Sequence, residues 1–173
     1  PAYCFALLRD LIHSTILLTL IEGLVLLGIF MGFLLTTLFM KDIRRVFMYH
    51  GAEHKTVFAW ENGCDLTVEN IRPFSPRHPR CGTSFILVVM VTSILVFSLL
   101  GRPDFILRVA YKLALFPVVA GIAYEIIRFS GKHRDKWWVR AISFPGLQLQ
   151  KITTREPTDD QIEVAVAAMK KVV

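Results

Sequence analysis

Long stretches of this 173-residue sequence lack charged side chains. Residues 14–40 contain a single charge, Glu22, and residues 83–100 contain none. Residues 105–127 are also apolar, although three charged side chains interrupt them. A helix needs about 20 apolar residues to cross the hydrocarbon core of a bilayer, and a chain this short could not bury three such helices in a soluble core. The expected membrane spans are residues 14–40, 83–101 and 105–128.

Cysteine is scarce, and repeats are absent. Cys4, Cys64 and Cys81 are too few and too scattered for a disulfide framework, and nothing in the sequence supports a bond between Cys64 and Cys81. No internal repeat or low-complexity segment is present, and "RPFSPRHPRCGTSF" lacks the glycine spacing of a phosphate loop. These absences argue against a disulfide-rich secreted domain, a repeat protein and a nucleotide-binding P-loop protein.

Positive charge is unevenly distributed along the chain. Of the 20 Lys and Arg residues, seven lie between Lys41 and Arg80 and nine lie from Arg128 onward. The positive-inside rule therefore places residues 41–82 and the tail 129–173 in the cytoplasm or an equivalent compartment such as a plastid stroma. Basic flanks facing anionic lipid account for the net charge of +6. We therefore expect membrane lipids as partners and no nucleic acid.

The segments outside the spans have patterns of their own. Apolar spacing predicts a helix over residues 41–62, ended by Gly63. Three prolines in residues 70–80 predict an irregular loop. The tail 129–173 is basic and amphipathic, and a terminal helix should begin at a capping box of Thr158 and Gln161. The fold class is all-α, a polytopic integral membrane protein with residues 1–173 forming a single membrane domain.

Two groups of residues could bind a metal ion. On the expected helix His50 and His54 share a face, with Glu53 close to it, in the H-x-x-E-H order of an inverted zincin motif. His78 and Cys81 lie three apart in the loop on the same predicted side of the membrane, and both residue types suit zinc. We predict a divalent metal, zinc, at this cluster. The alternative is a hydrogen-bonded polar cluster that anchors the loop to the helix.

Two metal arrangements remain open at this stage. In the open one, His50, His54 and a third ligand hold zinc, water takes the fourth position and Glu53 is the general base. In the closed one, His50, His54, His78 and Cys81 complete a tetrahedron, and the metal is structural. The basic side chains nearby, which count slightly against a bound cation, are Lys55, Arg77 and Arg80.

Several longer motifs together resemble one family. They are "MKDIRRVFMYHGAEHKT", "LTVEN", "PRHPRCGTSF", "PVVAGIAYEIIR", "PGLQLQKITTREP" and "DQIEVAVAA". They are similar to the YqhQ family, membrane proteins of bacteria and plastids that carry domain of unknown function 1385, over roughly residues 11–173. Members are labelled metal-dependent enzymes by inference from the same motif positions, which in this sequence are His50, Glu53, His54, His78 and Cys81. Members usually have a further N-terminal region, so we expect this chain to be a fragment.

Three functional hypotheses follow. The first is a membrane-bound metal-dependent enzyme, a hydrolase acting at the cytoplasmic or stromal face of a bacterial inner membrane or plastid membrane. The second is a non-enzymatic assembly factor or complex subunit, with a protein partner or a second copy, in which the cluster is a structural staple. A transporter using Glu22 and Glu125 is weaker, because three spans offer little pathway without oligomerisation.

Overall fold

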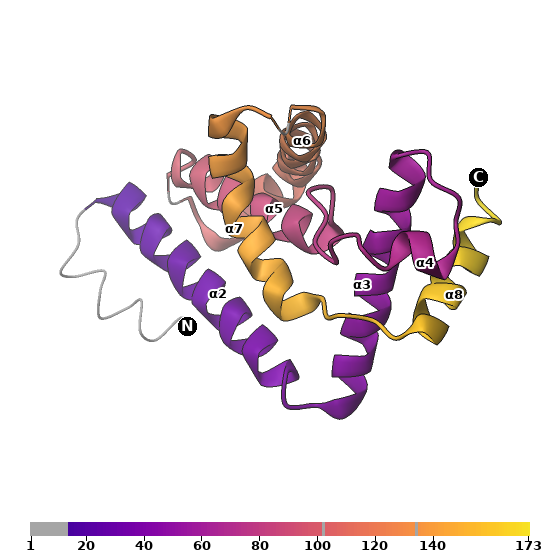
Figure 1. Cartoon of the computed structure of the whole chain (residues 1–173). Helices are drawn as coiled ribbons and strands as arrows, with labels where there is room; N and C mark the ends of the chain where they lie inside the picture. Colours follow the sequence, from indigo (N-terminus) through magenta and orange to yellow (C-terminus); the bar gives the residue numbers. More distant parts are fainter. Residues whose placement is uncertain (1–13, 102, 134) are drawn as a thin grey trace.

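The computed structural model describes residues 14–101, 103–133 and 135–173, so Cys4 lies outside the described residues. Within these ranges the protein is all-helical and has no strand, as the sequence predicts (Figure 1). The described helices are α2 (Thr15–Thr37), α3 (Lys41–Glu61), α4 (Val68–Ile71), α5 (Gly82–Ser98), α6 (Phe105–Lys132), α7 (Trp137–Thr153) and α8 (Asp159–Met169).

Local sequence signals set several helix ends. Gly63, immediately after the C-cap of α3, has φ +67, a left-handed conformation that glycine adopts without steric cost. At the start of α8, the Gln161 side chain accepts a hydrogen bond from the Thr158 backbone N–H at 3.0 Å, one half of the expected capping box. The basic segment that precedes α8 forms the regular helix α7, which bears the exposed Trp137 and Trp138.

Two of the three apolar stretches form helices long and apolar enough to cross a membrane. These are α2, with 23 residues, and α6, with 28, which continues past residue 128 to Lys132. The third, α5, has 17 residues and is therefore about 26 Å long, whereas a hydrocarbon core is about 30 Å thick. A third span is therefore less well supported than the other two.

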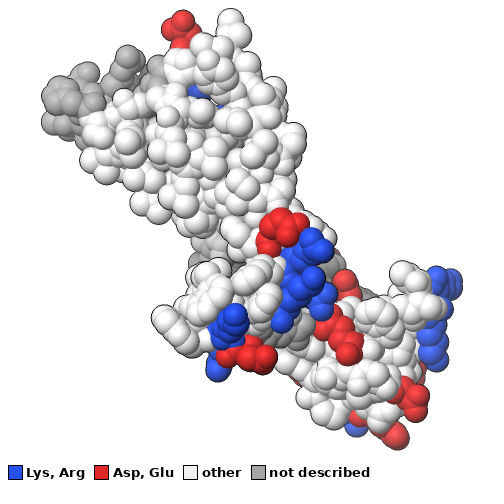
Figure 2. All heavy atoms as spheres, turned by 90° about the horizontal axis from the view of Figure 1, so that it is seen from above, with Lys and Arg blue, Asp and Glu red and all other residues white. Residues whose placement is uncertain are grey.

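The apolar surfaces of α2 and α6 are mostly uncovered by the rest of the chain. Of the most apolar 18-residue stretch of each helix, only 11% in α2 and 6% in α6 is buried by the rest of the fold. Core helices of a soluble protein bury such surface against other elements. Figure 2 shows a broad part of the molecule nearly free of charged side chains, while most charged groups in that view gather elsewhere. This pattern suggests membrane association.

The described helices pack in two groups. In the first, α5 contacts α2, α6 and α7. In the second, α3 contacts α4 and α8 around a small apolar core consisting of Ala52, Ala59, Ile71, Ile162 and Val166. In Figure 1, α3, α4 and α8 lie together on one side of the molecule, away from α5 and α6.

The link between α7 and α8 joins these groups by crossing the N-terminal half of α3. The Arg155 backbone N–H donates to the Phe47 carbonyl at 2.9 Å. The approach is so close that a Cβ on Gly51 would lie 2.0 Å from the Arg155 carbonyl oxygen. The buried Lys55 side chain donates to the Arg72 carbonyl at 2.7 Å and also pairs with Glu156 of the link. The glycine of "YHGAEH" therefore allows backbone to pack directly on the helix.

Gly51→Ala should destabilise the protein. The new methyl group meets backbone rather than a flexible side chain, so the link must move, at a cost of about 1–3 kcal/mol. Gly28→Ala in α2 is the matched control, because its Cβ would meet nothing within 4 Å. Thermal unfolding of the detergent-solubilised variants measures the difference. Equal midpoints for the two variants would show that this contact does not constrain the fold.

Candidate metal centre

His50 and His54 lie one helical turn apart on α3, and their rings meet with centroids 4.3 Å apart. His50 is partly buried and His54 is 5% exposed. Each ring contacts a backbone carbonyl through Nδ1: His50 with Thr153 at 2.8 Å, and His54 with Pro76 at 2.7 Å. A carbonyl oxygen can only accept, so each Nδ1 must carry the proton. In the neutral ring this leaves a lone pair on Nε2, the state in which imidazole binds a metal.

Cys81 approaches these rings from another part of the chain. It is the N-cap residue of α5 and is 3% exposed. Its Sγ lies 3.4 Å from His50 Nε2 and 3.0 Å from the Thr83 hydroxyl. One ligand atom from each of His50, His54 and Cys81 falls in a group whose members all lie within 4.8 Å of one another. The structure thus brings together three of the four expected ligands.

The surroundings of Cys81 favour its thiolate. Burial is the largest single influence and would raise the pKa, but hydrogen bonds with His50, His54 and Thr83 oppose it. The pKa of Cys81 is consequently lowered from 9.0 to about 5. The hydrogen bond with Cys81 is also the main cause of the raised pKa of His50, while burial of the ring acts against it. At neutral pH the sulfur therefore carries the charge that a metal ligand requires.

One measured separation within the group can be compared with the geometry of a tetrahedral zinc ion. Zinc lies about 2.0–2.1 Å from nitrogen and about 2.3 Å from sulfur, so neighbouring ligand atoms are roughly 3.4–3.6 Å apart. The separation of 3.4 Å between Cys81 Sγ and His50 Nε2 matches this directly. The hydrogen bonds on the two Nδ1 atoms are the outer contacts that orient metal-binding imidazoles. These residues fit a metal that has three protein ligands.

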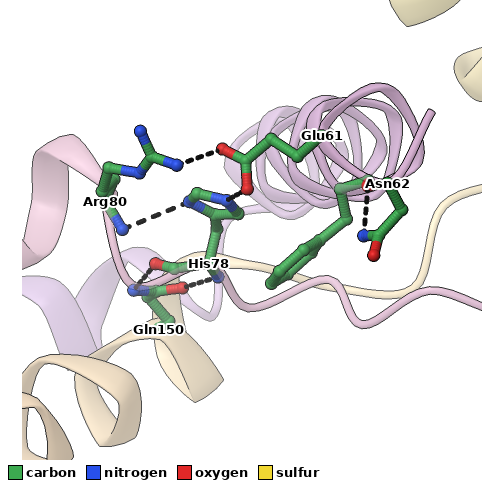
Figure 3. A network of polar contacts seen from close by, with 6 residues as sticks. Glu61, Asn62, His78, Arg80 and Gln150 are labelled. Carbon is green, nitrogen blue, oxygen red and sulfur yellow. Dashed lines mark hydrogen bonds and ion pairs between the residues drawn. The ribbon is translucent and has the colours of Figure 1, made fainter. Parts of the chain in front are cut away.

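His78 does not join this group. Its ring centroid lies 5.9 Å from that of His54, and both of its ring nitrogens have other partners. Nε2 lies 3.3 Å from a Glu61 carboxylate oxygen, and Nδ1 accepts from the Arg80 backbone N–H at 3.2 Å. Figure 3 shows His78 pointing toward Glu61, with Arg80 on the same carboxylate. His78 therefore lies beside the group of His50, His54 and Cys81 and not within it.

The buried amide of Gln150 on α7 anchors the His78 loop. Its Oε1 accepts from the His78 N–H at 2.7 Å, and its Nε2 donates to the His78 carbonyl at 2.8 Å (Figure 3). The same Nε2 donates to the Ser84 hydroxyl on α5 at 2.8 Å. Sequence reasoning missed Gln150 as a site residue. The available signal was a glutamine among the apolar positions of "PGLQLQK".

Glu53 lies outside the ligand group. It is exposed and lines a groove between α3 and α8, together with Tyr49, Thr56 and Val57 of α3. Its charge is the smallest of the influences on the pKa of His50, the largest being the hydrogen bond with Cys81. The carboxylate therefore acts on the centre at a distance and is not placed as a ligand.

Two of the basic residues that argued against a cation are neutralised by acidic partners. Lys55 pairs with Glu156, and Arg80 pairs with Glu61 at 2.6 Å. Arg77 is exposed to solvent, which screens its charge. The basic side chains around the centre therefore repel a bound cation less than the sequence suggested.

Gln150→Leu should loosen the loop and the centre together. The substitution keeps the approximate volume but leaves the buried His78 N–H and carbonyl unpaired, at a cost of about 1–3 kcal/mol for each group. The midpoint temperature of thermal unfolding and the affinity for added zinc should both fall. Gln148→Leu is the control, since Gln148 is half-buried on the same helix and takes no part in the two hydrogen bonds that hold His78. Wild-type zinc affinity in Gln150→Leu would contradict this role for Gln150.

The Cys81 thiolate should be directly titratable. In metal-free protein lacking the other two cysteines, thiolate ultraviolet absorbance should persist as pH falls from 9 and disappear around pH 5. Removing the imidazole partner in His50→Gln should move the midpoint to higher pH. Burial raises the pKa of Cys81, and one of the hydrogen bonds that oppose this effect is then lost. An unchanged midpoint in His50→Gln would show that the histidine does not stabilise the thiolate.

Comparison with known proteins identifies the family. The family described as protein of unknown function (DUF1385) matches residues 1–173. The chain is 43% identical over 129 residues to the uncharacterized protein YqhQ of Bacillus subtilis strain 168, an alignment that covers 75% of this chain and 41% of YqhQ. The chain thus spans about two fifths of the length of that relative, and no solved structure matches it. On the match over its whole length, the chain belongs to the DUF1385 family.

Proposed function

We propose that this protein is a membrane-bound zinc enzyme whose metal is held by His50, His54 and Cys81. The observation that carries the proposal is the meeting of these three ligand atoms within 4.8 Å. Catalytic zinc sites characteristically have three protein ligands and a water in the fourth position, whereas structural sites have four protein ligands. Because His78 is held by Glu61 and Arg80, the open arrangement is favoured.

The proposed reaction is a hydrolysis. Zinc lowers the pKa of bound water to about 7, which supplies hydroxide at neutral pH. Glu53 remains the proposed general base, on the strength of its position next to His54 and its electrostatic influence on His50. Its exposure to the groove beside α8 supports a role in which water or substrate reaches it from that side.

We also propose an orientation in the membrane. With α2 and α6 crossing, and the shorter α5 as a third span, the Lys- and Arg-rich segments 41–82 and 129–173 face the cytoplasm or a plastid stroma. The proposed centre then lies on that side, in a bacterial inner membrane or a plastid membrane. A hydrolase so placed would act at that membrane face.

One observation favours a second candidate, a structural metal in an assembly factor or complex subunit. The centre is largely buried, and it ties α3 to the start of α5, to the end of α7 through Thr153, and to the loop between α4 and α5 through Pro76. A metal here would fasten these segments whether or not any substrate is turned over. In this candidate the basic tail docks a protein partner or a second copy.

Metal analysis tests the ligand set. Purified wild-type protein should hold stoichiometric zinc, and His54→Ala and Cys81→Ser should lose it, because two ligands bind zinc much more weakly than three. His78→Ala is the matched control and should keep the metal. Absence of zinc binding by the wild type would contradict both metal candidates, and loss of zinc in His78→Ala would favour the closed arrangement.

Cobalt substitution separates the open from the closed site without a known substrate. The visible spectrum of Co²⁺ depends on its coordination, so added azide should change it if a position is open to exogenous ligands. Glu53→Gln should keep both the metal and the azide response. A cobalt protein whose spectrum does not respond to azide would reject the catalytic proposal and favour the structural one.

A further inference from the structure

A small cavity lies between α2, α5 and α6, and none of the metal ligands lines it. Its volume is about 180 Å³. Its walls are mostly apolar and include Leu26 of α2 together with Val89 and Ile94 of α5. Glu22 and Lys112 also line it. An apolar pocket with charged groups has the chemistry of an amphiphile site.

The charged groups form a compact set with an excess of positive charge. Arg108 of α6 pairs with Glu22 of α2 at 2.5 Å. Lys112, one turn after Arg108, is half-buried, and its Nζ lies 5.5 Å from the centroid of the Phe97 ring. Among the described residues lining this cavity and the small hollow beside it, these three carry charge, one negative and two positive. The set therefore has a net positive charge.

The depth of this set in the membrane is consistent with a lipid headgroup. Glu22 and Lys112 each lie seven residues from the start of their helix, which is about 10 Å along the axis. Since α6 has 28 residues and is about 42 Å long, its first turns extend beyond a hydrocarbon core of about 30 Å. With the hydrocarbon core centred on α6, Lys112 would lie a few ångströms inside the boundary between acyl chains and headgroups, where phosphate groups are found.

We propose that this cavity binds an anionic phospholipid. The phosphate group lies beside Lys112 and beside Arg108, the basic member of the ion pair. Part of one acyl chain lies against Leu26, Val89 and Ile94. A charge at this depth is costly unless paired, and the phosphate provides the second negative charge that the three side chains lack. The site depends on α2 and α6 being in a membrane, but not on the metal centre.

Lipid titration tests this directly. The detergent-solubilised protein is titrated with phosphatidylglycerol or with phosphatidylcholine of the same acyl chains, and bound lipid is counted by native mass spectrometry. Phosphatidylglycerol should bind about fivefold more tightly, since one basic residue near a membrane surface contributes roughly that factor. Lys112→Gln should abolish the preference, and Lys112→Arg should retain it. Equal binding of the two lipids by the wild type would overturn the proposal.

Two further variants separate the contribution of charge to lipid binding from the contribution of the cavity's shape. Lys132→Gln, at the exposed far end of α6, is the charge control and should keep the wild-type preference. Val89→Phe should weaken binding of phosphatidylglycerol by filling the apolar part of the cavity without altering any charge. If glycerol phosphate alone stabilises the protein against heat as well as the intact lipid does, the site binds a soluble phosphate and the lipid proposal is wrong.

Discussion

The candidate centre depends on the way buried Gln150 holds the backbone of His78. One amide satisfies both the N–H and the carbonyl of that residue and also reaches Ser84 at the start of α5. The loop between α4 and α5 contains prolines and has no regular secondary structure to pair its backbone groups, so this side chain does it instead. Its position determines where Cys81 emerges, and hence whether the sulfur can meet His50 and His54.

Carbonyl groups from the end of α7 and from the loop between α4 and α5 complete this arrangement. Thr153 and Pro76 each accept a hydrogen bond from an Nδ1 atom, which leaves the two Nε2 atoms as the groups available to a metal. The end of α7 contacts His50, and Gly51 leaves room for the Arg155 carbonyl of the following link to lie on α3. The same packing brings Glu156 to the buried Lys55. Packing and electrostatics therefore act together to leave a sulfur and two imidazoles as the available ligands.

Much of this protein could be predicted from sequence, for reasons of local physics. Helical periodicity placed His50 and His54 on one face, and the glycine after α3 and the capping box of α8 identified two helix ends. The all-α fold was predicted from apolar stretches of about the length that a membrane-crossing helix needs. The C-terminal end of α5 was harder to predict, because Leu99 and Leu100 follow its last residue, Ser98, and a hydropathy pattern cannot separate them from the helix.

The sequence by itself determined which residues could bind metal: two histidines one turn apart, and a histidine and a cysteine three residues apart in a loop. Only the tertiary structure decided that Cys81 joins the pair while His78 turns to Glu61, since the loop has no periodicity from which side-chain directions follow. It also placed Glu53 on the groove beside α8. These choices depend on contacts between residues far apart in the sequence, 31 positions for His50 with Cys81 and 72 for His78 with Gln150, and no local pattern encodes them.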